Sequence, residues 1–175
     1  CAEVMKNNFF NLYSHDFARV AVATPRCKIA DPGFNAAETI RLAQEAAAQG
    51  AVLVAFPELG LSAYSCEDLF QQLALLAACE AALQQVAAAS AKLTAAIIVG
   101  LPMRVGHQLF NCAAVIAGGR VLGVVPKSFL PNYGEFYEAR QFSAADCAST
   151  DSIELFGESV PFGAGLLFEV ANLPL

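Results

Sequence analysis

AVLVAFPELG, residues 51–60, sets the pattern for the first third of the chain. Its first six residues are all apolar, which is typical of a strand in a sheet covered on both faces. A second β-rich apolar run, FARVAVAT at residues 17–24, comes before it, and a helical pattern lies between the two. Strand, helix and strand form a βαβ unit, so we expect the two strands to be parallel neighbours.

The helix between these strands has a start and a stop signal. Asn35 followed by Glu38 resembles a capping box, and Gly50 closes the helix. Helical spacing predicts a buried face made by Ala36, Ile40, Ala43 and Ala47. The same spacing predicts an opposite, solvated face made by Glu38, Arg41 and Glu45.

The rest of the chain predicts a mixed α/β sheet, with parallel strands first and antiparallel pairs later. We expect a long helix over residues 66–90, with a buried stripe formed by Leu69, Leu73, Leu76 and Leu83. AAIIVGL (95–101) reads as a third buried strand, and residues 108–127 read as two strands around Gly118-Gly119. Residues 128–142, rich in turn residues and aromatics, are too long to be a mere connector. Short strands alternate with Gly/Pro turns in the remainder.

Composition excludes several classes of protein. The chain has 175 residues, enough for about one domain, and 57% of them are apolar. A net charge of −6 without a basic run argues against nucleic-acid binding. No apolar run reaches the roughly 18 residues of a membrane span, and the start lacks the pattern of a secretory signal. We expect residues 1–8 to be disordered or a non-native start, with Met5 as the natural one.

The cysteine and histidine content further limits the kinds of site that the chain can form. The six cysteines lie far apart with no C-x-x-C pair, which fits reduced thiols in a cytoplasm better than a zinc site or a disulfide scaffold. His15 and His107 are the two imidazoles, so a His-based metal site has little to work with. We therefore expect a cytoplasmic protein with no metal in this domain.

Two charges follow strands directly. Glu58 comes after VLVAFP and Lys127 comes after VLGVVP. Pockets in α/β sheets open at the carboxyl ends of strands. A paired Glu and Lys would tune the acid as a proton acceptor and stabilise a developing oxyanion. The alternative is that each is a solvated loop charge.

A thiol near Glu58 is a candidate nucleophile. Cys66 falls in the first turn of the predicted helix, where the pKa of a thiol is lowered. Glu67 and Asp68 suit the helix dipole but oppose a thiolate at Cys66, which argues against catalysis by this residue. Cys79 and Cys112 lie within helix and strand patterns and are expected to be small core residues.

Three segments carry a family resemblance. LYSHDFARVAVATP (12–25), FPELGLSAY (56–64) and VVPKSFLPNYGEFYEARQF (124–142) together resemble the nitrilase (carbon–nitrogen hydrolase) superfamily. More narrowly, they look like the N-terminal glutaminase domain of glutamine-dependent NAD+ synthetases. The resemblance runs from about residue 9 to the end of the chain. It implies a four-layer α-β-β-α sandwich, which we expect to be incomplete at its C-terminal side.

The resemblance assigns roles to residues of this chain. It places the general base on Glu58, the oxyanion-stabilising lysine on Lys127 and a second acid that orients the lysine on Glu138. Glu135 lies nearby, but the motif favours Glu138. Tyr64, Tyr133 and Phe136 match positions that line or shape the glutamine pocket, with loop packing as the alternative.

The nucleophile of the family has no match here. In the family it follows a later strand, in a segment resembling V-E-I-C-E-D, and this chain ends at LLFEVANLPL where that strand should begin. The C-E-D at residues 66–68 imitates this signature at the wrong place. We therefore expect these residues alone to hydrolyse no glutamine. The resemblance also implies a synthetase domain as partner, with ATP, Mg²⁺ and deamido-NAD+ used there, and a homo-oligomer.

Two alternatives stay open at this point. One is a stand-alone amidase or carbamoylase of the same superfamily. The other is a non-catalytic α/β module that binds a partner through apolar surface, in which Glu58 and Lys127 need not meet. A separation above about 7 Å between their charged groups would favour that module, since hydrogen-bond reach is about 3 Å.

Overall fold

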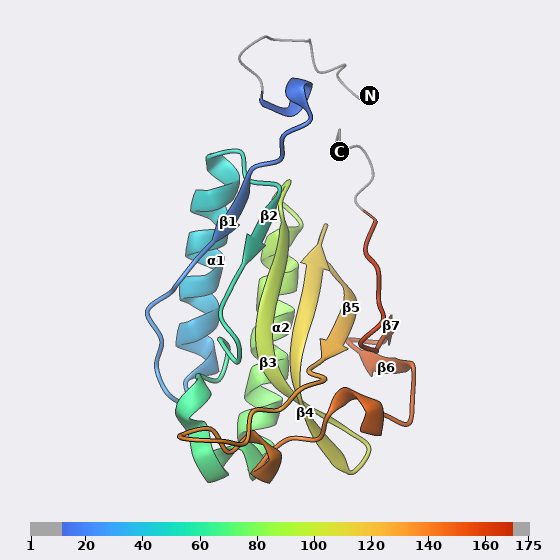
Figure 1. Cartoon of the computed structure of the whole chain (residues 1–175). Coiled ribbons are helices and arrows are strands. Elements are labelled where there is room, and N and C mark those ends of the chain that lie inside the picture. The colour runs from blue at the N-terminus through green and yellow to red at the C-terminus, as the bar shows by residue number, and fades with distance from the viewer. Residues whose placement is uncertain (1–11, 170–175) are drawn as a thin grey trace.

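A computed structural model of the chain describes residues 12–169. Residues 1–8, expected to be disordered or a non-native start, and the last residues of LLFEVANLPL lie outside the described residues. The main feature is a five-stranded sheet in the order β1-β2-β3-β4-β5 (Figure 1). Its strands are β1 (Val20–Val22), β2 (Leu53–Ala55), β3 (Ala96–Val105), β4 (Gln108–Ala117) and β5 (Arg120–Pro126).

The sheet is parallel in its first half and antiparallel in its second. β1 pairs with β2 and β2 with β3 in parallel, whereas β4 is antiparallel to both β3 and β5. The two-residue turn between β4 and β5 is Gly118-Gly119, and both glycines have positive φ, 59° and 87°. The predicted βαβ unit and the later antiparallel hairpin are both confirmed.

Helix α1 (Pro32–Ala48) begins earlier than predicted. Asp31 is its N-cap, with Oδ1 accepting from the N–H of Phe34 at 3.1 Å, and Pro32 fits the first turn, where no N–H is needed. Asn35 is instead fully buried, and its side chain donates to the carbonyl oxygens of Lys28 and Leu61. The capping-box assignment was wrong because Asp31, four residues before Asn35, is the N-cap and Pro32 begins the helix.

The predicted outer face of α1 is also partly wrong. Glu38 is only 8% exposed, because Arg26 and Arg41 fold over its carboxylate. Hydrogen bonds from these two arginines lower the pKa of Glu38. The buried positions Ala36 and Ala43 are as predicted.

The helix expected over residues 66–90 is two helices. A 3₁₀ segment, η2 (Tyr64–Gln71), ends before α2 (Leu73–Ser90), and Gln72 between them is extended. Glu67 has φ 50° and ψ −129°, so the chain kinks and the helical phase changes. The predicted stripe is therefore wrong at its start, with Leu69 37% and Leu73 71% exposed. The buried side of α2 is formed by Leu75, Cys79, Ala82, Leu83, Val86, Ala87 and Ser90.

Helix α2 is long and apolar enough to meet the criteria for a membrane span, with a mean hydropathy of 1.4 over 18 residues. The sequence analysis expected no apolar run of about 18 residues, and α2 reaches that length when its mean hydropathy is used as the criterion. One such helix is weak support for a span, since a core helix passes the same test. In the fold, α2 packs against α1, β3 and β4.

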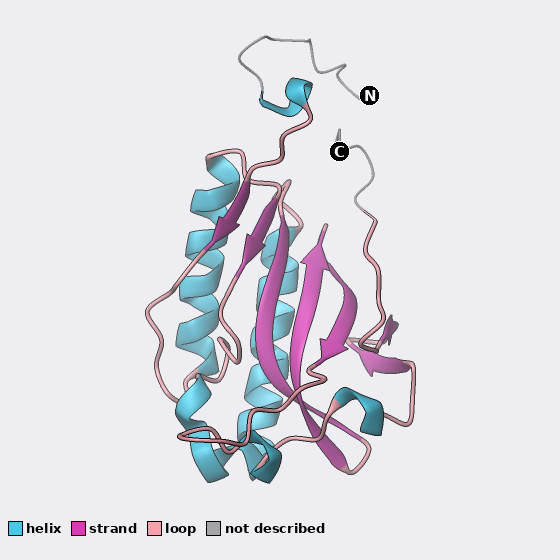
Figure 2. Ribbon diagram, viewed as in Figure 1, coloured by secondary structure: helices cyan, strands magenta, loops and turns pink. Residues whose placement is uncertain are grey.

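The molecule has a helical layer and a sheet layer. α1 and α2 lie side by side on one face of the sheet (Figures 1 and 2). The main core fills the space between, with the buried side chains Ile97, Val99, Phe110, Ala114 and Ile116. On the other face, apolar side chains of the edge strand β1 are exposed to solvent. Val20 is 61% exposed and Val22 is 86% exposed. These two layers are the α and β layers of one half of the expected sandwich.

The remaining elements are short. A hairpin of β6 (Ser152–Leu155) and β7 (Glu158–Pro161) packs beside β5. Three further 3₁₀ turns are η1 (Leu12–His15), η3 (Glu138–Arg140) and η4 (Ala145–Cys147). The segment from β5 through η3 runs across the end of the sheet where β2 and β5 finish (Figure 1).

Candidate active site

Glu58 and Lys127 meet at one edge of the sheet. β5 runs parallel to β3 because each is antiparallel to β4, and β2 is also parallel to β3. The carboxyl ends of β2 and β5 therefore lie at the same edge, and each charge follows its strand within three residues. Lys127 Nζ lies 2.6 Å from Glu58 Oε1. This contact confirms that the two charges converge. It argues against the alternative that each is a separate, solvated loop charge.

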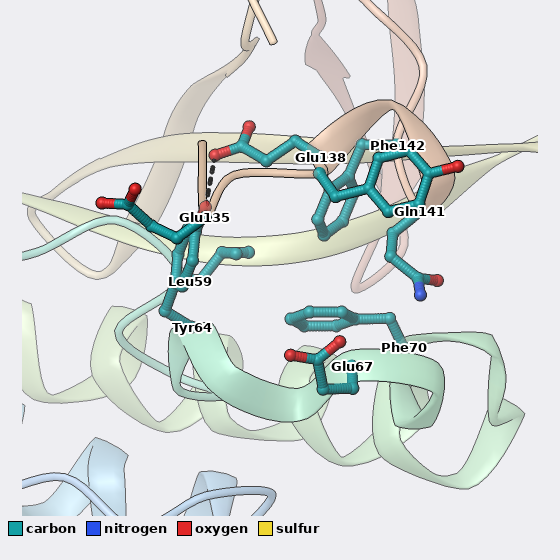
Figure 3. A pocket seen from close by; sticks show the side chains of 9 residues that line it. Leu59, Tyr64, Glu67, Phe70, Glu135, Glu138, Gln141 and Phe142 are labelled. Carbon is teal, nitrogen blue, oxygen red and sulfur yellow. Dashed lines mark hydrogen bonds between the residues drawn. The ribbon is translucent and has the colours of Figure 1, made fainter. Parts of the chain in front are cut away.

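Glu138 completes a charged cluster around Lys127. Its side chain is 4% exposed, and Lys127 Nζ donates to Oε1 at 3.0 Å and to Oε2 at 2.9 Å. The hydroxyl of Tyr64 donates to the same Oε1 at 2.8 Å (Figure 3). Glu135 is exposed and makes no such contact with Lys127 among the described residues. Glu138 is thus the second acid at the lysine, as the motif predicted.

The two carboxylates keep Lys127 charged. Partial burial alone would favour the neutral amine. The hydrogen bonds and charges of Glu58 and Glu138 outweigh that effect and raise the pKa of Lys127 above its usual value. An ammonium held by two acids can shift toward a third negative atom, such as an oxyanion, when one develops beside it.

The backbone around Glu58 is tightly constrained. Leu59 adopts φ 51°, a left-handed conformation that is uncommon for a branched side chain. The same segment lies on β3, where the N–H of Leu61 donates to the carbonyl of Gly100 at 3.0 Å. A Cβ at Gly100 would lie 2.3 Å from the Leu59 nitrogen and 2.8 Å from the Pro57 oxygen. Glycine at position 100 is what permits this close approach.

Asn111 of β4 is a buried polar residue that the sequence analysis did not single out. It is 3% exposed, and its Nδ2 donates to Glu58 Oε1. Its main-chain carbonyl accepts from the N–H of Lys127 at 2.8 Å. The available signal was the amide of Asn111 inside a strand, QLFNCAAVIA, that is otherwise apolar after its first residue.

A pocket of about 90 Å³ opens beside Glu138. Tyr64, Glu67 and Phe70 line it from η2, and Glu135, Tyr137, Gln141 and Phe142 line it from the opposite segment (Figure 3). A tilted contact between the rings of Phe70 and Phe142, with centroids 5.0 Å and planes 59° apart, joins the two walls. An ion pair between Asp68 and Arg140 joins them at the surface, at 3.0 Å.

The three aromatic residues predicted for substrate binding have different surroundings. Tyr64 lines the pocket and contacts Glu138. Tyr133 is 73% exposed and packs edge-on against Phe136, with centroids 6.0 Å apart, and neither lines the pocket beside Glu138. Their assignment to a glutamine pocket stays a prediction.

The described cysteines are poorly placed as nucleophiles for this cluster. Cys66 is buried, its Sγ donates to the carbonyl of Ser62 at 3.0 Å, and burial raises its pKa. Burial likewise raises the pKa of Cys79 to about 12 and raises that of Cys112. Within residues 12–169, no cysteine is hydrogen-bonded to Glu58 or Lys127. The Glu-Lys-Glu cluster therefore has acid, base and cation but no thiol beside them in this part of the chain.

In residues 12–169 there is no group of three or more His, Cys, Asp or Glu side chains that could hold a metal ion. The charged cluster itself contains two carboxylates whose shared partner is an ammonium. Its chemistry is that of proton transfer and anion stabilisation.

Comparison with known proteins identifies relatives of this chain in sequence and in structure. The chain is 46% identical over 167 residues to a glutamine-dependent NAD(+) synthetase of Mycobacterium tuberculosis, covering 95% of this chain and 24% of the relative. A crystal structure of a glutamine-dependent NAD(+) synthetase from Cytophaga hutchinsonii superposes with a TM-score of 0.80 at 28% identity, covering 87% of this chain and 26% of that one. The chain thus spans about a quarter of the length of the relatives it matches.

A more distant likeness shows the fold alone. An amidase from Nesterenkonia superposes with a TM-score of 0.61 at 22% identity, over 82% of this chain and 55% of that one. The family model for carbon-nitrogen hydrolase matches residues 19–168, which include Glu58, Lys127 and Glu138. This 175-residue chain belongs to the carbon-nitrogen hydrolase family.

Proposed function

We propose that this chain forms the acid–base part of a glutaminase site that releases ammonia from the side-chain amide of glutamine. The observation that carries the proposal is the single ammonium of Lys127 held between Glu58 and Glu138. The relatives at 46% and 43% identity, from Mycobacterium tuberculosis and Mycobacterium leprae, are named glutamine-dependent NAD(+) synthetases, which supports glutamine as the amide.

The cluster suits amide hydrolysis through a thioester. Glu58 takes the proton of an attacking thiol, and the sulfur adds to the amide carbon. Lys127 stabilises the oxyanion that forms on the amide oxygen. The C–N bond then breaks and ammonia leaves with the proton returned by Glu58. Water activated by Glu58 adds to the thioester, which gives glutamate and the free thiol.

The thiol is proposed to come from a cysteine beyond residue 175. None of the described cysteines is hydrogen-bonded to Glu58 or Lys127, and the chain corresponds to about a quarter of the length of its relatives. On this proposal the 175 residues alone release no ammonia from glutamine.

The use of the ammonia is inferred from the same relatives. We propose that a synthetase domain, using ATP and Mg²⁺, transfers the ammonia to deamido-NAD+ to form NAD+. The two relatives named above and the structural neighbour are all named NAD(+) synthetases, and each is about four times as long as the part matched here. A cytoplasmic homo-oligomer stays part of the proposal.

The two rival functions have less support. Similarity to the Nesterenkonia amidase at 22% identity shows a shared fold and does not favour an amide other than glutamine. A non-catalytic binding module does not require Glu58 and Lys127 to meet, and the observed 2.6 Å between Nζ and Oε1 removes the separation that would have favoured it.

Ammonia release by the full-length protein tests the proposal. We expect hydrolysis of glutamine to exceed that of asparagine or of an N-carbamoyl amino acid. Glu58→Gln keeps the size of the side chain and removes the base, so kcat should fall by about 10²- to 10⁴-fold. A coupled glutamate dehydrogenase assay measures the rate. Equal activity of Glu58→Gln and wild type, or a preference for a carbamoyl substrate, would contradict the proposal.

A further inference from the structure

Asn111 connects both halves of the charged cluster to one strand. β4 lies between β3, against which the segment after Glu58 packs, and β5, which leads into Lys127. The side-chain amide of Asn111 donates to Glu58 Oε1, and its main-chain carbonyl accepts from the N–H of Lys127 at 2.8 Å. One residue thus holds a carboxylate with its side chain and the partner lysine with its backbone.

The surroundings of Asn111 are apolar, which makes the amide notable. On the face of β4 that carries Asn111, the next two side chains are those of Ala113 and Val115, and Asn111 itself is 3% exposed. A buried amide is costly unless it is hydrogen-bonded. Its donor is satisfied by Glu58, and a bond to a charged acceptor is the stronger kind.

Glu58 needs such an anchor more than its partner acid does. The Glu58 side chain is 41% exposed, whereas that of Glu138 is 4% exposed. A long side chain on a loop loses rotamer freedom when it is held at one geometry. Without a second donor, Lys127 alone would have to hold Glu58 while also bonding Glu138.

We propose that Asn111 is the positioning residue for the general base, holding Glu58 so that Oε2 is the oxygen that accepts the thiol proton. Among the contacts of the described residues, Asn111 Nδ2 and Lys127 Nζ both reach Oε1. Oε1 is therefore engaged by two donors, and Oε2 is left as the acceptor. This inference rests on the proposed function and adds a residue to that site.

Steady-state kinetics of Asn111 variants in the full-length protein test the inference. Asn111→Leu has a similar volume but no donor, so kcat should fall about tenfold to a hundredfold. KM for glutamine should stay within about twofold, because Asn111 is proposed to hold the base rather than the substrate. Asn111→Asp keeps the shape and puts a second carboxylate against Glu58, so its kcat should fall further.

Val115→Thr is the matched control. Val115 lies four residues along β4 from Asn111, on the same face of the strand, and is 8% exposed. A hydroxyl there changes the polarity of the face without reaching Glu58, so kcat should be close to that of wild type.

A crystal structure of Asn111→Leu, or of Asn111→Asp if the Leu variant does not fold, gives a reading independent of activity. The Glu58 carboxylate should leave Lys127 and turn toward solvent. The inference is overturned if kcat stays within about twofold of wild type, or if Glu58 keeps its place in the variant structure. Wild-type protein that releases no ammonia from glutamine would instead overturn the proposed function, and the position of Glu58 in the variant would still decide the role of Asn111.

Discussion

Lys127→Met lowers glutamine hydrolysis by the full-length protein at least about a thousandfold. The substitution keeps an unbranched side chain but removes the cation that lies between Glu58 and Glu138. Loss of one oxyanion-stabilising donor costs about 10²- to 10³-fold in kcat, and here the partner of the base is lost as well. Ammonia release at saturating glutamine measures the effect.

The same substitution destabilises the fold. The side chain of Glu138 is 4% exposed, and within residues 12–169 Lys127 is the cation paired with its carboxylate. Removing one partner of a buried pair costs about 3–5 kcal/mol in the free energy of unfolding. The double variant Lys127→Met/Glu138→Leu replaces both charges by apolar groups and should recover most of the stability without recovering activity.

Lys92→Met is the control for a lost lysine. Lys92 is exposed just after α2, and its substitution should leave both rate and melting temperature near wild type. Ammonia release by Lys127→Met above about a tenth of the wild-type rate would contradict the assigned role of this lysine.

Gly100→Ala lowers kcat by about a hundredfold because it displaces Glu58. The new Cβ would lie 2.3 Å from the Leu59 nitrogen and 2.9 Å from the Glu58 carbonyl carbon. These neighbours are backbone atoms, so residues 57–59 must move away from β3. Displacement of a catalytic group by about 1 Å is enough for a loss of this size.

Gly163→Ala is the matched control, because a Cβ at Gly163 meets nothing within 4 Å. It should keep wild-type activity and stability. A crystal structure of Gly100→Ala should show Glu58 shifted from Lys127. Unchanged kinetics with Glu58 in its original place would show that β3 does not set the position of the base.

The order of the elements was predictable because periodicity reports burial directly. The apolar runs around residues 17–24, 51–56 and 95–101 gave three parallel strands, and Gly118-Gly119 gave the hairpin. The predictions that were wrong depend on local backbone detail. The helix predicted over residues 66–90 is interrupted because Glu67 takes a positive φ and Gln72 is extended, and periodicity alone contains no signal for either.

The charged cluster was predictable from its position at strand ends together with the family motif. Strand ends place Glu58 and Lys127, and the motif adds Glu138, which contacts the lysine as expected. Asn111 and Gly100 were missed because their roles depend on how β4 and β3 pack beneath the loops. Asn111 and Glu58 are 53 positions apart in sequence, and Gly100 and Leu59 are 41 positions apart. No local sequence pattern reports contacts over such separations.

Covalent labelling with a chloroketone analogue of glutamine tests the central claim most directly. The thiolate displaces chloride and forms a stable thioether, and peptide mass spectrometry then locates the modified cysteine in the full-length protein. We predict one modified cysteine beyond residue 175 and none among Cys27, Cys66, Cys79, Cys112 and Cys147. Modification of Cys66, or of any other cysteine within these 175 residues, would contradict the account.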